Sequence, residues 1–111
     1  VIISPKSYVS SKSEIGNGTI IMHKAIVNID SKIGKNCIIN SRSLIEHEVT
    51  VGKNCHISTG SVLNGKVQIG NDTFVGSGTI VKEGVRIGSR CVIGMGTIIK
   101  RNIKDKKILK K

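Results

Sequence analysis

The chain has 111 residues, enough for one domain, and a chain of this length buries only about 60–65% of the surface that it exposes when unfolded. It has 18 Lys and Arg against seven Asp and Glu, a net charge of +11, and almost no aromatic residues. No run of about 18 apolar residues and no signal-peptide pattern is present, so we expect a cytoplasmic protein without a membrane span. The first residue is Val1 rather than Met, which is compatible with a fragment.

Aliphatic residues recur at every sixth position from Ile3 to Ile99 without exception. A small or β-branched residue stands two positions before each of them, from position 7 to position 97. This period is neither that of an α-helix nor that of an isolated strand. Alternation within a short strand sends the aliphatic and the small residue inward and the residue between them outward. The pattern is therefore a hexapeptide repeat.

A second period of 18 residues is superimposed on the first. Glycines follow the aliphatic residue at five positions: Gly16, Gly34, Gly52, Gly70 and Gly88. Three hexads therefore make one turn, and the simplest solid with this property is a triangular prism whose corners favour Gly and Asn, which tolerate positive φ. The sequence predicts an all-β solenoid of five to six turns over residues 1–99, followed by a basic C-terminal tail over 100–111.

This pattern resembles the left-handed parallel β-helix of the hexapeptide-repeat acyltransferases over residues 3–99. The handedness is implied by the resemblance. Solenoids of this kind also serve as inert scaffolds, so the fold alone does not establish catalysis.

Three cysteines occupy the small inward position: Cys37, Cys55 and Cys91. A disulfide, a metal site and a nucleophile are the functional alternatives. None is supported by a CxxC motif or by a companion histidine at ligand spacing. We therefore predict stacked core thiols and no metal site.

The positive charge has three possible explanations. Seven basic residues against one Asp gather in "KRNIKDKKILKK" at residues 100–111. A solvated surface explains most corner lysines. Nucleic acid would require an aromatic platform or a recognised motif, and neither occurs, so we predict no nucleic-acid partner. Coenzyme A, with its pyrophosphate and 3′-phosphate, suits the fold better.

The three histidines lie in different places on the predicted prism. His23 lies at a corner without an acidic neighbour, and we treat it as structural or peripheral. His47 lies at a corner two residues after Ile45, whereas His56 projects outward from the middle of a strand. Their separation of nine residues is half a turn, so one subunit cannot bring them together. Three parallel prisms around a threefold axis could.

The segment from residue 38 to residue 70, "IINSRSLIEHEVTVGKNCHISTGSVLNGKVQIG", is similar to the sialic-acid and UDP-4-amino-sugar acetyltransferase branch of this family. Asn40, His47, Glu48, His56 and Gly65 match its motif. The resemblance implies that His47 is the general base and that Glu48 orients it. It also implies that His56 comes from a neighbouring subunit near the acetyl group, that the Gly65 amide donates to the thioester oxygen, and that Asn40 lies near the acceptor.

The same resemblance points to cofactor contacts from the backbone of later hexads, at Gly76, Ser77, Gly94 and Met95. It implies direct acetyl transfer from acetyl-CoA to an amine or hydroxyl of a sugar, in a homotrimer with active sites between subunits. Glu46 has no role in the motif. A non-catalytic structural β-helix and a basic polyanion-binding module remain the alternatives, and the acceptor stays open.

Overall fold

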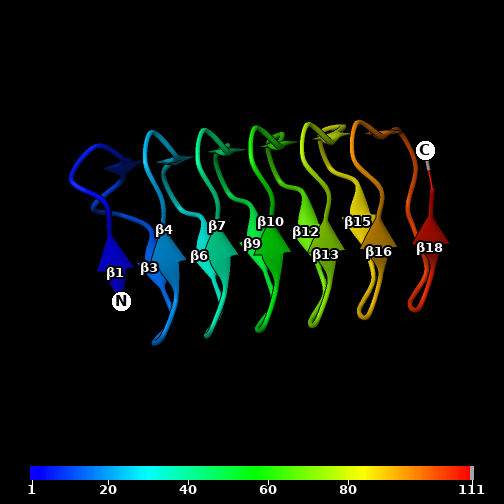
Figure 1. Cartoon of the computed structure of the whole chain (residues 1–111), viewed down its shortest axis with the longest axis horizontal. Coiled ribbons are helices and arrows are strands. Elements are labelled where there is room, and N and C mark those ends of the chain that lie inside the picture. The colour runs from blue at the N-terminus through cyan, green and yellow to red at the C-terminus, as the bar shows by residue number, and fades with distance from the viewer. Residues whose placement is uncertain (111) are drawn as a thin grey trace.

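The structure is a computed structural model that describes residues 1–110. It contains eighteen two-residue strands and no helix in this range, so no helix could cross a membrane there. The strands form three parallel sheets along a rod with extents of 33 × 22 × 20 Å (Figure 1). The predicted all-β fold, a left-handed parallel β-helix, is confirmed.

The chain visits three sheets in turn, which we name A, B and C. Sheet A contains β1 (Ile2–Ile3), β4 (Ile20–Ile21), β7 (Ile38–Ile39), β10 (His56–Ile57), β13 (Phe74–Val75), β16 (Val92–Ile93) and β18 (Ile108–Leu109). Sheet B contains β2 (Tyr8–Val9), β5 (Ile26–Val27), β8 (Leu44–Ile45), β11 (Val62–Leu63), β14 (Ile80–Val81) and β17 (Ile98–Ile99). Sheet C contains β3 (Glu14–Ile15), β6 (Lys32–Ile33), β9 (Thr50–Val51), β12 (Gln68–Ile69) and β15 (Arg86–Ile87).

The bends between strands form three corners, named by the sheets that they join. The A–B corner comprises residues 4–7, 22–25, 40–43, 58–61, 76–79 and 94–97. The B–C corner comprises residues 10–13, 28–31, 46–49, 64–67 and 82–85. The C–A corner comprises residues 16–19, 34–37, 52–55, 70–73 and 88–91.

The core is a stack of aliphatic side chains along the rod axis. Ile57 and Leu63, the second residues of β10 and β11, are 0% exposed. Burying one such side chain fully contributes about 1.5–3 kcal/mol. Most of the small inward residues are buried too, and hydroxyls among them bond to backbone carbonyls, as Ser61 does to Gly76 O at 3.1 Å. Every buried side-chain N or O atom within residues 1–110 has a hydrogen-bond partner.

The cysteines lie in this core as predicted. Cys37, Cys55 and Cys91 are free and buried. The thiol of Cys37 donates to Gly52 O at 3.0 Å, and the thiol of Cys55 donates to Gly70 O at 2.9 Å. Each thiol therefore takes the place of a core hydroxyl and bonds to the next coil.

Each corner turns through a residue in the left-handed region. From residue 18 to residue 96, the third residue after each inward aliphatic has φ between 56° and 78°. Only some of these residues are glycines, and the others include Glu48 and Arg42. The left-handed conformation costs a non-glycine residue about 1–2 kcal/mol. The hydrogen bonds and packing of the stacked coils therefore enforce the turn.

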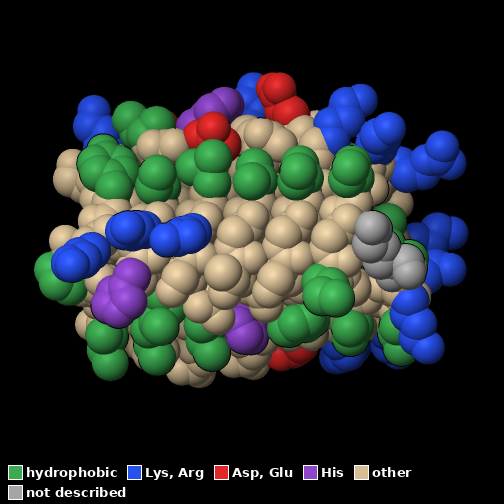
Figure 2. Space-filling view, turned by 45° about the horizontal axis from the view of Figure 1, so that its top comes forward, with side chains coloured by type: hydrophobic (Ala, Val, Ile, Leu, Met, Phe, Trp, Pro, Cys, Tyr) green, Lys and Arg blue, Asp and Glu red, His purple; other side chains and the backbone are tan. Residues whose placement is uncertain are grey.

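The basic segment after Ile99 continues the solenoid through residue 110. Ile103 bridges to Ile87, and β18 pairs with β16. Leu109 faces Ile93, so the last coil is two residues shorter than the others, which explains why the six-residue pattern ends at Ile99. Lys and Arg side chains gather at this end of the rod on the face that Figure 2 shows.

Gly84→Ala tests the demand for a left-handed turn. Gly84 has φ of 75°, and a Cβ there would meet no atom within 4 Å, so the substitution changes only the backbone preference. We expect the free energy of unfolding to fall by about 1–2 kcal/mol in urea denaturation. Glu83→Ala, one residue earlier and exposed, should change it by less than about 0.5 kcal/mol. Equal effects of the two variants would contradict this account.

Candidate active site

A histidine and a glutamate form a hydrogen-bonded pair at the B–C corner, directly after β8. His47 Nδ1 lies 2.9 Å from Glu48 Oε1, and the two side chains are 47% and 50% exposed. A carboxylate can only accept a hydrogen bond, so we assign the imidazole proton to Nδ1. The left-handed backbone at Glu48, with φ of 59°, sets the direction in which its side chain leaves the corner. The Nε2 atom of His47 then carries the free lone pair that a general base requires.

Gly65 lies one coil further along the same corner, against the imidazole of His47. A Cβ on Gly65 would lie 2.5 Å from His47 Nε2, so any side chain there would displace the ring. This spatial requirement was not foreseen from the sequence. The 18-residue separation, which places both residues in one column, was the signal that could have revealed it.

A second group forms where sheet A meets the A–B corner. Asn40 Nδ2 lies 3.1 Å from His56 Nε2. The His56 ring meets Phe74 edge to face, with centroids 5.3 Å apart and planes at 87°. Burial lowers the pKa of His56. Burial thus favours the neutral form of His56, and in the 3.1 Å contact the Asn40 amide donates to Nε2.

The four residues expected at the cofactor all lie at the A–B corner: Gly76, Ser77, Gly94 and Met95. A Cβ on Gly76 would lie 2.6 Å from Met95 N and Ile93 O, so close stacking of the coils already requires this glycine. Ser77 is exposed, and Met95 is 73% exposed. These residues share a corner with Asn40 but not with His47.

Three backbone amides share one property. Gly65, Ser77 and Met95 each stand two residues after an inward aliphatic residue, and none of their N–H groups makes a hydrogen bond within residues 1–110. The amides on either side of Gly65 differ, because Lys66 N, for instance, donates to His47 O at 3.0 Å. The fold thus leaves one outward N–H donor free at each of these three positions.

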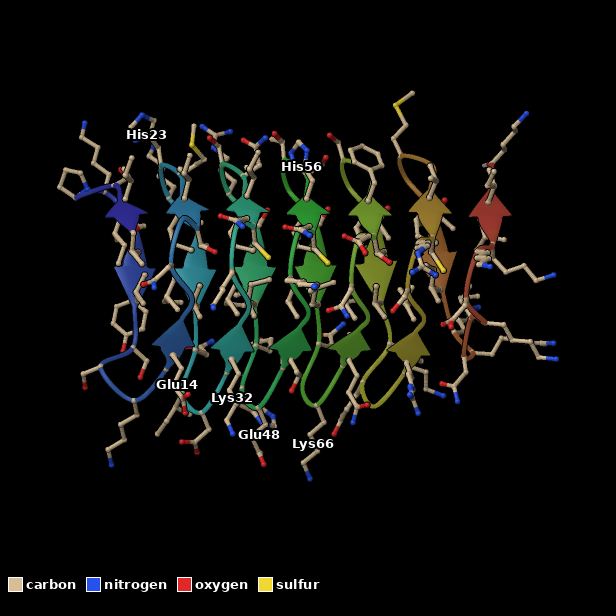
Figure 3. All side chains as sticks on the ribbon, turned by 90° about the horizontal axis from the view of Figure 1, so that it is seen from below. Glu14, His23, Lys32, Glu48, His56 and Lys66 are labelled. Atoms are coloured by element: carbon tan, nitrogen blue, oxygen red, sulfur yellow. The ribbon has the colours of Figure 1, made fainter. Side chains whose placement is uncertain are left out.

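The structure assembles two groups but does not unite them in one chain. His47 lies with Glu48 and Gly65, whereas His56 lies with Asn40. Figure 3 shows Glu48 and His56 on opposite sides of the rod. Glu46, which the sequence left without a role, accepts a hydrogen bond from Asn28 Nδ2 at 2.7 Å.

A hollow among residues 1–110 lies away from both histidine groups. A cavity of about 500 Å³ opens at the C-terminal end of the rod. Its lining residues are Arg86, Gly88, Asn102, Ile103, Lys104 and Asp105. Neither histidine group lines this cavity, and the side chains of His47 and Glu48 are each about half exposed. No group of three or more His, Cys, Asp or Glu that could hold a metal occurs within residues 1–110.

Comparisons with known proteins agree with this description. The family model described as bacterial transferase hexapeptide (six repeats) matches residues 30–65 and 66–101. The acetyltransferase domain of PglB from Neisseria gonorrhoeae superposes with a TM-score of 0.95 at 30% identity, over 96% of this chain and 52% of that one. PerB from Caulobacter crescentus, in complex with CoA and GDP-perosamine, gives a TM-score of 0.95 at 32% identity, over 97% of this chain and 53% of that one.

A more distant structure, WeeI from Acinetobacter baumannii, shares the fold, with a TM-score of 0.67 at 21% identity over 86% of this chain and 50% of that one. No curated protein sequence matches the chain. The chain spans about half the length of these solved structures.

The environment of His56 predicts its titration. Because burial lowers its folded pKa, His56 should titrate below the ordinary value of about 6.5 in an NMR pH titration. At pH values near and below about 6.5, His56 binds more protons in the unfolded chain than in the folded chain. The free energy of unfolding should therefore fall as the pH drops from the unfolded pKa toward the folded pKa. His56→Gln cannot titrate and should lose less stability between pH 7 and pH 5. A His56 pKa at or above the ordinary value would contradict this prediction.

Proposed function

Because the chain belongs to the bacterial transferase hexapeptide family, we propose that it transfers an acetyl group from acetyl-CoA to an amine or hydroxyl of a sugar. The observation that carries the proposal is the His47–Glu48 pair, which lies against Gly65 with Nε2 of the imidazole and the Gly65 amide both free. Acyl transfer needs a base for the nucleophile and a donor for the oxyanion.

The relatives support the substrate class. The acetyltransferase domain of PglB has a structure in complex with acetyl-CoA, and PerB has one with CoA and GDP-perosamine. Both are about 30% identical to this chain over nearly its full length. A nucleotide-linked amino sugar is therefore the acceptor that we favour. A cytoplasmic location stays a prediction.

The chemistry assigns one task to each residue. Nε2 of His47 takes the proton from the attacking amine while the new bond forms to the acetyl carbon. The Glu48 carboxylate holds the ring and stabilises the imidazolium. The Gly65 amide donates to the developing oxyanion, a contact that can be worth about 3 kcal/mol. The C–S bond then breaks, and the thiolate of coenzyme A receives the proton from His47.

The second group serves the cofactor and the acceptor. His56, neutral because of its burial, is able to lie beside an uncharged thioester, and Asn40 holds its ring by the 3.1 Å contact. The free amides of Ser77 and Met95 donate to the amide and phosphate oxygens of coenzyme A. Gly76 and Gly94 leave the backbone uncovered between these two donors.

Assembly completes the site. Sheets A and B present apolar outward columns, whereas sheet C presents polar residues. The column of sheet A is Ile2, Ile20, Ile38, His56, Phe74, Val92 and Ile108. The column of sheet B is Tyr8, Ile26, Leu44, Val62, Ile80 and Ile98. Two apolar faces suit a homotrimer in which each chain contacts two neighbours, and there the B–C corner of one chain reaches sheet A of the next.

Substitution of the base tests the activity. His47→Ala should lower kcat about 10²–10⁴-fold without unfolding the chain, because it removes proton transfer. Glu48→Gln should lower kcat less, because Nε2 of His47 is still present to accept the proton. Asp30→Asn is the matched control, since Asp30 occupies the same left-handed position one coil earlier and bonds to neither histidine. Equal kcat for His47→Ala and wild type would refute the assignment.

Mixed assemblies test whether the site is shared. His47→Ala and His56→Ala chains should each be nearly inactive alone. When the two are unfolded, mixed in equal amounts and refolded, about one quarter of the sites in a random trimer combine an intact His47 with an intact His56 from the next chain. We expect a corresponding recovery of wild-type activity. A mixture no more active than its components would mean that each site lies within one chain.

A further inference from the structure

The last coil forms a strongly basic end of the rod, which we call the basic end. Residues 100–110 contain one acidic residue, Asp105, and six exposed basic ones: Lys100, Arg101, Lys104, Lys106, Lys107 and Lys110. No Lys or Arg within residues 1–110 lies at ion-pair distance from a carboxylate. Asp105 instead accepts a hydrogen bond from Ser89 N at 2.9 Å. Figure 3 shows several nitrogen-tipped side chains that extend beyond β18, past the last coil.

Apolar side chains lie among these cations, where the core meets the end of the rod. Ile103 and Leu109 pack against the core but remain partly exposed. Both line a hollow of about 380 Å³ together with Lys100 and Arg101. Both also line a second hollow of about 280 Å³, to which Lys107 contributes. The basic end therefore combines an apolar floor with a cationic rim.

The basic end stays open in the trimer that we propose. Lys104, Lys106 and Lys107 lie at the C–A corner, between the Ile103 bridge of sheet C and β18 of sheet A. The proposed contacts between chains cover the sides of the rods, at sheets A and B, and do not cross the end of the last coil. A threefold axis along the rods places the three basic ends in one plane. The trimer thus presents a single basic surface at its C-terminal end.

We infer that the basic end docks on a lipid bilayer that contains acidic phospholipids. Acidic headgroups attract clusters of Lys and Arg, and each such residue near the surface raises the partition coefficient roughly fivefold. Apolar side chains among the cations suit the boundary between the headgroups and the acyl chains. Nucleic acid would leave this apolar floor unused, and residues 99–110 contain no aromatic residue on which bases could stack.

A rod that docks by its basic end stands upright on the lipid. His47 and Arg101 both lie at the B–C corner, three coils apart. At about 4.8 Å per coil, His47 stands roughly 14 Å above the last coil. The candidate active site therefore remains clear of the bilayer. The inference adds a location to the proposed function and leaves its chemistry unchanged.

Vesicle binding tests this surface. In sedimentation at low ionic strength, wild type should bind vesicles made of equal parts phosphatidylglycerol and phosphatidylcholine, and salt should release it. It should not bind vesicles of phosphatidylcholine alone. The triple variant Lys104→Gln, Lys106→Gln, Lys107→Gln should bind the acidic vesicles at least tenfold more weakly. It should keep the wild-type circular dichroism spectrum, because none of the three lysines forms an ion pair within residues 1–110.

The matched control is Lys32→Gln, Lys35→Gln, Lys53→Gln, which removes three exposed charges from sheet C and the C–A corner of earlier coils. It should bind the acidic vesicles within twofold of wild type. An equal loss of binding in both variants would mean only a general attraction to the net charge. Tighter binding of wild type to duplex DNA than to the vesicles would assign the basic end to nucleic acid. Either result, or no binding of wild type to acidic vesicles, would overturn the inference.

A fluorescent probe locates the contact. The native cysteines are buried, so a polarity-sensitive dye should react only with an added exposed thiol. On Lys107→Cys the emission of the dye should shift to the blue when acidic vesicles are added. On Lys35→Cys, which lies far from the end of the rod, it should not shift. A shift at both positions, or at Lys35→Cys alone, would contradict docking by the basic end.

The vesicle measurements need no turnover, so they stand apart from the proposed function. The triple variant at the basic end should keep its KM for acetyl-CoA within twofold of wild type, because the expected cofactor contacts at Ser77 and Met95 lie at the A–B corner. A larger rise in this KM would assign the three lysines to the cofactor and overturn the inference. If wild type acetylates no sugar, the proposed function fails, whereas vesicle binding still decides the docking surface.

Discussion

The register between successive coils is the constraint on which the rest of the structure depends. Paired strands are offset by 18 residues, as His56 and Phe74 are, and backbone bonds such as Tyr8 N to Ala25 O at 2.9 Å repeat along the rod. An inserted or deleted residue would turn every later side chain to another face. Residues 18 apart are therefore direct neighbours for most of the chain. Only the last coil, where Ile93 pairs with Leu109, departs from this register.

Because of this register, residues that are 18 positions apart in the sequence lie next to each other at the candidate site. His47 and Gly65 are one coil apart, so the absence of a side chain at one makes room for the ring of the other. The left-handed turn that closes every hexad falls on Glu48 and orients its carboxylate beside Nδ1 of His47. In the proposed site, the corner amides that stacking leaves unbonded are the donors for an oxyanion and a cofactor. The candidate site thus uses features that every coil possesses, and only the side chains at His47, Glu48, Asn40 and His56 are special to it.

The period of six made the fold predictable, because the inward column from Ile3 to Ile99 and the buried cysteines follow from alternation alone. The opposite placement of His47 and His56 followed from counting half a turn. The contact between Asn40 and His56 did not, because these residues are 16 positions apart and meet only through the rotamers of two side chains in adjacent coils. The final coil was also missed, since its shortening by two residues removes the pattern while β18 still pairs with β16.

The shape of the rod is the reason for proposing a site shared between chains. Two-residue strands with tight corners produce a convex prism, and water has free access to His47 and Glu48, which are each about half exposed. An oxyanion donor and a general base act most strongly where water is excluded. A convex rod can create such a place only by packing against another rod, and its apolar outward columns on sheets A and B favour that contact. In the trimer that we propose, catalysis and assembly are one requirement, because the neighbour that covers His47 also supplies His56.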